Sequence, residues 1–216
     1  MNIANLDAYR PRAWRIGASV AALTVVLLLG ACSGIPVRAL PRLMNLQHQL
    51  LILDPAEFVM AIQVDVRMTP PPGAVPTLQL AIRPSEPGAF EAIDKRLPMR
   101  FTSATTSALG LQTPPTGRHW LIYSLPYESQ AELRRLQGRF RQLQSQSGDG
   151  KRGASVSIGI AQDGLAAGAS ALAGTRWETW LRTSTPEGFY EIWSGTAGDL
   201  LKQGEAETQT RTTKAK

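Results

Sequence analysis

Alternation of apolar and polar side chains with a period of two constrains the fold of this chain more than any other feature. The segment FVMAIQVDVRM (58–68) places large apolar residues from Phe58 to Met68 on one face, and Gln63 and Asp65 on the other. Successive side chains of a strand point to opposite faces, so this pattern predicts a strand with one buried face. Further strands are predicted at 77–84, 97–101, 120–125, 154–161, 175–183 and 188–193.

One segment has instead the period of an amphipathic helix. In SQAELRRLQGRFRQLQSQ (129–146), four apolar residues from Leu133 to Leu143 fall on one face, and Ser129 and Glu132 have the spacing of a capping box. About seven strands and one helix predict a mainly β (α+β) domain, a two-layer β-sandwich-like arrangement with the helix packed on it. A single open sheet covered by the helix is the alternative. The small-residue segment DGLAAGASALAG is interpreted as a linker.

The N-terminal segment combines basic residues with a short apolar run. Arg10, Arg12 and Arg15 precede or border residues 16–29, which carry no charge. A helix of these 14 residues would reach about 21 Å, short of the roughly 30 Å hydrocarbon core of a bilayer. The pattern therefore favours an export signal over a membrane span.

The single cysteine of the chain follows this run directly. Leu29, Gly30, Ala31 and Cys32 give a branched apolar residue, two small residues and a thiol. The segment resembles the lipobox of bacterial lipoproteins, and the resemblance covers only the first 32 residues. It implies cleavage before Cys32, a diacylglyceryl group on its sulfur and an acyl group (such as palmitate) on the new amino group. Ser33, where inner-membrane lipoproteins carry aspartate, favours the outer membrane of a Gram-negative envelope, facing the periplasm.

Two alternatives remain for Cys32: an uncleaved N-terminal anchor and a free, buried thiol. Leu43, Leu46 and Leu50 favour a short helical turn in the segment after the cysteine. Along the chain we expect a signal peptide at 1–31, a lipidated cysteine and tether at 32–50, a β-rich periplasmic domain at 51–201 and a disordered tail at 202–216.

Charge and cysteine content narrow the classes of partner. After residue 31 the chain carries 20 basic and 16 acidic residues, and no basic stripe stands out among them. Nucleic-acid binders present a basic face, so no nucleic-acid partner is expected. An acylated Cys32 leaves neither a disulfide nor a thiolate ligand, and we expect no cofactor and no metal.

Catalytic motifs are sparse. His48 and His119 are interpreted as boundary or surface residues, and the serines of GASVS and GASAL lack the second glycine of a nucleophile elbow. We therefore expect no enzymatic activity. The alternative is an envelope hydrolase that acts on peptidoglycan or glycan through paired carboxylates. Its candidates by residue type are Asp54, Glu57, Asp65, Glu178, Glu187 and Glu191.

The last predicted hairpin is rich in aromatic residues: Trp177, Trp180, Tyr190 and Trp193. Trp177 and Trp180 differ in strand parity, so both faces carry a large ring. One set is expected in the core, and the other is a candidate interaction patch, because exposed aromatic rings serve as interface anchors. The leading hypothesis is a lipid-anchored, non-enzymatic periplasmic module that binds an envelope protein or glycan. A ligand carrier with a hollow between its layers is a third hypothesis.

Overall fold

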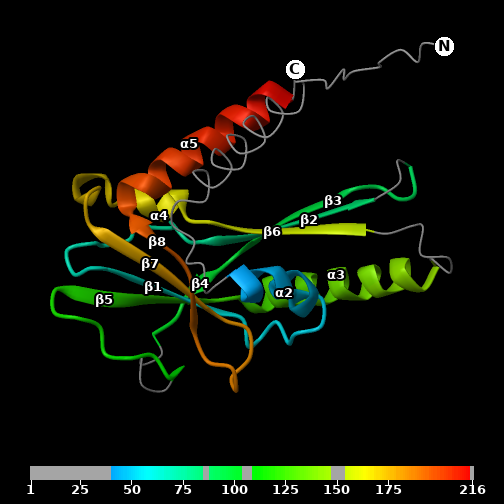
Figure 1. Cartoon of the computed structure of the whole chain (residues 1–216), viewed down its shortest axis with the longest axis horizontal. Coiled ribbons are helices and arrows are strands. Elements are labelled where there is room, and N and C mark those ends of the chain that lie inside the picture. Colours follow the sequence, from blue (N-terminus) through cyan, green and yellow to red (C-terminus); the bar gives the residue numbers. More distant parts are fainter. Residues whose placement is uncertain (1–39, 85–87, 104–108, 147–153, 215–216) are drawn as a thin grey trace, which may run out of the picture. The chain divides into compact units, whose positions relative to one another are not determined.

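The computed structural model of the chain contains eight strands in two antiparallel sheets (Figure 1). It describes residues 40–84, 88–103, 109–146 and 154–214. The chain divides into Met1–Gly34 and Ile35–Lys216, and every described residue belongs to the second unit. The predicted export signal and Cys32 lie outside the described residues.

The larger sheet has the strand order β4-β5-β1-β7-β8. Its strands are β4 (Arg100–Phe101), β5 (Arg118–Ser124), β1 (Val59–Asp65), β7 (Arg176–Arg182) and β8 (Tyr190–Thr196). The strand predicted within 58–68 is confirmed as β1, which lies at the centre and pairs with β5 and β7. Both of its faces are buried, although the sequence predicted only one. Val59 and Ala61, on the second face, pack against Leu111 and Ile122, so a loop supplies a second covering layer.

The smaller sheet has the order β3-β2-β6, formed by β3 (Ile93–Pro98), β2 (Thr77–Pro84) and β6 (Ala154–Ala161). The strands predicted at 77–84 and 154–161 are confirmed with the same bounds. The strand predicted at 97–101 is split, because the chain leaves the smaller sheet after Pro98 and enters the larger one at Arg100. Between them, the buried Met99 donates its backbone N–H to the carbonyl of Pro76 at 2.9 Å. Pro98 ends β3, which is an edge strand of the smaller sheet.

Helix α3 (Tyr127–Gln146) confirms the predicted helix. Its predicted capping box does not form. The Ser129 hydroxyl instead donates to the carbonyl of Pro98 at 2.8 Å, and the Glu132 carboxylate pairs with Lys95 at 2.8 Å. Both side chains are therefore used to dock α3 on β3. Ahead of the sheets, α2 (Leu40–Leu50) buries Leu46 and Leu50, so this part of the predicted tether packs into the core.

Two segments predicted without regular structure are helical. The presumed linker contains α4 (Asp163–Ala167) and the 3₁₀ helix η4 (Ser170–Leu172), with Leu165 buried in the core. Its small residues serve close packing: a Cβ on Gly168 would lie 2.5 Å from the Pro71 ring. Helix α5 (Ala197–Lys214) runs through most of the predicted tail and packs on α4. Among the described residues, no helix combines the length and apolarity needed to cross a bilayer.

A single large core joins the inward faces of both sheets with residues of α2 and α3. Its large, fully buried side chains include Trp177, Tyr123, Phe58, Leu50, Met60, Ile62 and Leu133. The two sheets pack against each other, which confirms the β-sandwich-like α+β fold. The alternative of one open sheet is wrong, because the break at Met99 divides the strands between two sheets.

Candidate binding cleft

Three of the four aromatic residues of the β7–β8 hairpin belong to the core. Trp177 is 1 % exposed, Tyr190 6 % and Trp193 9 %. Trp180 is half-buried and lies on the outer face of the larger sheet. Of the four rings in the predicted interaction patch, only Trp180 is therefore partly exposed.

A β-bulge explains why the parity of the sequence misplaced one ring. The pairing register of β7 and β8 shifts beside Thr179, which lies opposite Trp193, whereas Leu181 lies opposite Tyr190. The extra residue, Ile192, separates the two pairs. Directly opposed residues share a face of the sheet, so Trp193 and Tyr190 both point inward although three positions separate them.

Trp180 lines a cleft of about 590 Å³ on the outer face. The floor is contributed by Gln63 from β1, Arg118 and Trp120 from β5, and Glu178 together with Trp180 from β7. Gln63 lies opposite both Trp120 and Glu178, so three strands place these side chains in one row. The segment from Gly110 to Pro115 forms a wall, and Phe189 closes another side.

The aromatic part of the cleft is held in a defined geometry. The rings of Trp120 and Trp180 meet edge to face, with centroids 6.1 Å apart and an interplanar angle of 84°. The indole N–H of Trp120 donates to the carbonyl of Gln112 at 2.9 Å, which ties the wall to the floor. Ala61 lies directly opposite Trp180, and its small side chain leaves room beside the ring. The rings are therefore preorganised by sheet pairing and by the covering loop.

A charged network forms the polar part. The Arg118 guanidinium donates to the carbonyl of Gln63 at 2.7 Å and lies 3.3 Å from the Glu178 carboxylate. Arg176 donates a hydrogen bond to the same carboxylate oxygen. Burial raises the pKa of Glu178, but the hydrogen bonds and charges of Arg176 and Arg118 outweigh this and lower the pKa below its usual value. Two cations thus surround one ionised carboxylate, and positive charge remains in excess.

Two hydrogen-bond donors of the cleft residues are unsatisfied. Trp180 Nε1 and Arg118 Nε are both buried and have no partner in the described part of the chain. Both are N–H groups that only donate. A buried donor without an acceptor costs about 1–3 kcal/mol.

The carboxylates considered for a hydrolase are distributed over the domain. Asp54 pairs with Arg134, Asp65 pairs with Arg67, and Glu57 accepts the backbone N–H of Thr185. Glu187 accepts from the Thr183 hydroxyl at 3.5 Å, and Glu191 is buried on β8. Of the six candidates, only Glu178 lines the cleft. No paired carboxylates meet among the residues that line it.

His119 does not line the cleft. His119 is half-buried on β5, where burial lowers its pKa despite the opposing charge of Asp65. His48 falls within α2, and its side chain lies outside the described residues. In the described ranges, no three His, Cys, Asp or Glu side chains are grouped as metal ligands.

Arg118 and Trp120 were not singled out from the sequence. Their identical parity places both on one face of β5. No local pattern in the sequence showed that the loop at 110–115 covers this face of the sheet.

Fold and cleft together define the class: a β-sandwich-like α+β domain with an aromatic and charged cleft on the outer face of its larger sheet. No known family model matches the chain, and neither the curated proteins nor the solved structures compared with it give a match.

Proposed function

We propose that this chain is a lipid-anchored envelope lipoprotein whose domain is a binding or accessory module without catalytic activity. The observation that carries the proposal is the outer-face cleft, which combines fixed aromatic rings, an arginine–glutamate network and two unsatisfied donors. Trp and Arg are the residues most enriched among the anchors of protein interfaces. A second observation, the lipobox-like segment at Leu29–Cys32, supports the anchor.

A protein segment is the partner that fits the cleft best. The side chains of an extended polypeptide can pack against Trp120, Trp180 and Phe189, which line the cleft. The excess positive charge beside Glu178 favours a segment with acidic or carbonyl-rich character. A glycan that stacks on the rings is the competing partner.

Anchoring at Cys32 would keep the domain attached to a membrane surface. Helix α2 begins at Leu40, eight residues after Cys32, so the fully extended chain between these two residues spans at most about 29 Å. The partner is therefore expected in the envelope, within reach of a domain attached to lipid.

Capture of a partner from detergent-extracted envelopes tests the cleft. The full chain, produced in a Gram-negative host, should retain a partner that Trp180→Ala binds about 30-fold more weakly, as expected for an interface anchor worth about 2 kcal/mol. Tyr127→Ala is the matched control, because this ring is 77 % exposed at the start of α3 and lies outside the cleft. Thermal unfolding of both variants separates lost binding from lost folding.

Two results would contradict the proposal. Equal capture of the partner by Trp180→Ala and by the parent chain would show that the cleft does not bind the partner. Retention of a purified glycan, with no protein retained, would show that the partner is a glycan. The mass of the N-terminal peptide tests the anchor independently. It should begin at Cys32 and carry diacylglyceryl and acyl mass, whereas an unmodified peptide that includes Leu29–Ala31 would contradict lipidation.

A further inference from the structure

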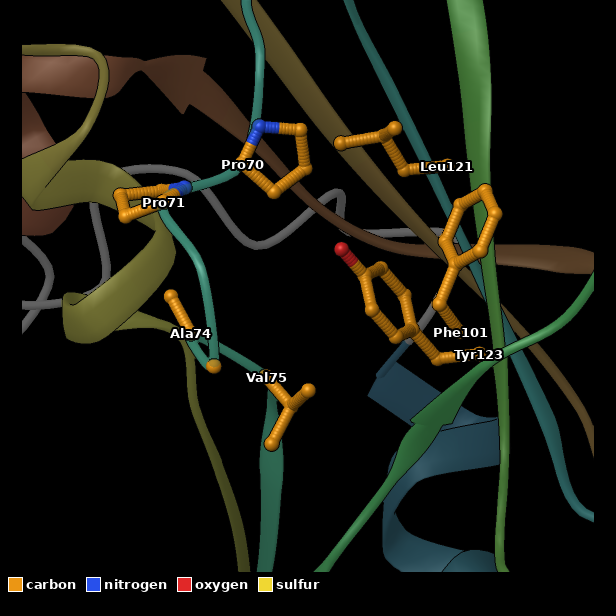
Figure 2. Close-up of a pocket in the computed structure, with 8 residues that line it drawn as sticks. Pro70, Pro71, Ala74, Val75, Phe101, Leu121 and Tyr123 are labelled. Carbon is orange, nitrogen blue, oxygen red and sulfur yellow. The ribbon is translucent and has the colours of Figure 1, made fainter.

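A second pocket lies on the inner face of the larger sheet, between β5, the edge strand β4 and the loop that leads to β2 (Figure 2). It has a volume of about 330 Å³. One wall is the loop that carries Pro70, Pro71 and Val75, and the other is formed by Leu121 and Tyr123 of β5. None of the residues that line it is charged, and its surface is almost entirely carbon.

Tyr123 contributes the single polar side-chain atom that Figure 2 shows in this pocket. The residue is 1 % exposed, and its hydroxyl points from β5 toward the proline loop. That hydroxyl has no hydrogen-bond partner among the described residues. Burial raises the pKa of Tyr123 to about 12, so the group stays protonated and is available as a donor. Buried hydroxyls are normally hydrogen-bonded. A hydroxyl that faces a cavity without a partner therefore indicates that the cavity can hold a ligand with an acceptor.

The pocket is preorganised on both sides. The rings of Phe101 and Tyr123 meet edge to face at 5.7 Å, which holds the tyrosine in place. On the opposite wall, Gly73 adopts a φ of 77°, a conformation that L side chains rarely adopt, and turns the loop toward β2. Pro71 is braced from behind by Gly168, where no Cβ would fit. Phe101, 52 % exposed, stands at the mouth.

We propose that this pocket binds a neutral amphiphile, an aliphatic chain with one uncharged oxygen that accepts a hydrogen bond from Tyr123. The carbon walls suit the chain, and the single donor suits one acceptor such as an alcohol or an ester carbonyl. A free carboxylate fits poorly, since no cation lines the pocket to compensate its desolvation. The volume falls at the small end of the roughly 300–1,000 Å³ typical of ligand sites.

This site is independent of the outer-face cleft, because the two lie on opposite faces of β5 and share no lining residue. Loss of partner capture and loss of amphiphile binding can therefore be told apart.

Photoaffinity labelling of the full chain in lipid nanodiscs tests the proposal. The probe is a 1-decanol analogue with a diazirine on its chain, and labelled peptides are identified by mass spectrometry. We expect labels on the peptides that contain Val75 and Leu121. Unlabelled 1-decanol and methyl decanoate should compete, and the relative strength of the two shows whether an alcohol or an ester is preferred. Decanoate should compete at least tenfold more weakly. From octanol to decanol, competition should strengthen about fourfold per methylene.

Matched variants identify the side chains on which amphiphile binding depends. Tyr123→Phe should weaken competition by 1-decanol about three- to tenfold, the value of one hydrogen bond. Tyr190→Phe, a buried tyrosine of the same sheet that does not line the pocket, should leave it unchanged. Ala74→Trp should abolish labelling by filling the space. Phe101→Asp, at an exposed position, should reduce labelling at least tenfold and serves if the tryptophan variant does not fold.

Three outcomes would overturn the proposal. If unlabelled 1-decanol does not reduce labelling by the probe, the pocket does not bind such a ligand. Labels that persist in both Ala74→Trp and Phe101→Asp would place the site elsewhere. Equal competition in Tyr123→Phe and the parent chain would show that the hydroxyl does not bind the oxygen.

Discussion

At the scale of single residues, buried side-chain amides connect elements that are distant in the sequence. Gln162 is buried just before α4, and its Oε1 accepts hydrogen bonds from Trp177 Nε1 at 3.1 Å and from the Thr179 hydroxyl at 3.0 Å. Gln137 donates to the carbonyls of Leu50 and Leu53, at 2.8 and 2.9 Å, and so ties α3 to the end of α2. These amides satisfy groups that burial would otherwise leave without partners.

Replacement of Gln162 by leucine should therefore destabilise the domain by about 2–4 kcal/mol, because two buried donors lose the acceptor that they share. The free energy of unfolding in urea measures the effect. Gln142→Leu, an exposed position on α3, is the control and should change stability by less than about 0.5 kcal/mol. The double variant Gln162→Leu/Thr179→Val also lacks the Thr179 hydroxyl, one of the two donors left without this acceptor. It should be about 1 kcal/mol more stable than Gln162→Leu. An unchanged stability in Gln162→Leu would show that these hydrogen bonds contribute nothing net.

At the scale of elements, helix α5 depends on its first turn. Its N-terminus carries a capping box: the Asp199 carboxylate accepts the backbone N–H of Thr196 at 2.9 Å, and the Asp199 N–H donates to the Thr196 hydroxyl at 3.2 Å. The Thr-x-x-Asp spacing is present in the sequence, whereas the Ser129–Glu132 spacing that was predicted to cap α3 serves other contacts. Spacing alone does not decide which of two such motifs forms.

Thr196→Ala should reduce the stability of α5 by about 1 kcal/mol, because the first-turn N–H of Asp199 loses its acceptor. Amide hydrogen exchange should report faster exchange in residues 197–205, with little change in β2. Asp199→Asn keeps an acceptor for the Thr196 N–H and should have a smaller effect. Unchanged exchange in Thr196→Ala would mean that packing on α4 alone maintains the helix.

At the scale of the whole molecule, stability should fall in acid. The pKa values of Asp54, Asp65, Glu132 and Asp199 are all lowered in the folded state, each chiefly through a hydrogen bond that the carboxylate accepts. A group with a lowered pKa stabilises the fold above its unfolded pKa, and this contribution is lost as the pH falls through the folded value. The carboxylate contribution should therefore decline below the ordinary values of 3.8 to 4.5.

His119 should add an earlier step. Burial lowers its pKa, so the unfolded chain takes up this proton first, and stability begins to decline just below the ordinary value of 6.5. Urea unfolding measured from about pH 8 down to about pH 3 should show both steps. His119→Asn should remove the earlier step and keep the carboxylate decline. A profile that is flat down to the carboxylate range in the parent chain would contradict the assignment to His119.

Local patterns in the sequence were sufficient to locate most of the strands and the helix α3. Period-two alternation located β2 and β6 with their observed bounds, and helical periodicity located α3, since both depend on residues close together in the chain. The lipobox-like segment at Leu29–Cys32 is likewise readable from sequence alone. Local pattern does not show that the apolar alternation around Met99 is divided between two sheets. Nor does it show that the small residues around Gly168, which look like a linker, pack against Pro71.

Both pockets were decided by the tertiary structure. The cleft needs Gln63, Arg118 and Trp180 from three strands in register, and the bulge beside Thr179 determines which rings of the last hairpin remain outside. The second pocket exists because a proline loop stands opposite Tyr123 without reaching its hydroxyl. Alternation reports which side chains share a face of one strand. Which strands become neighbours, and what covers each face, depends on contacts between distant residues, and only the folded chain brings these together.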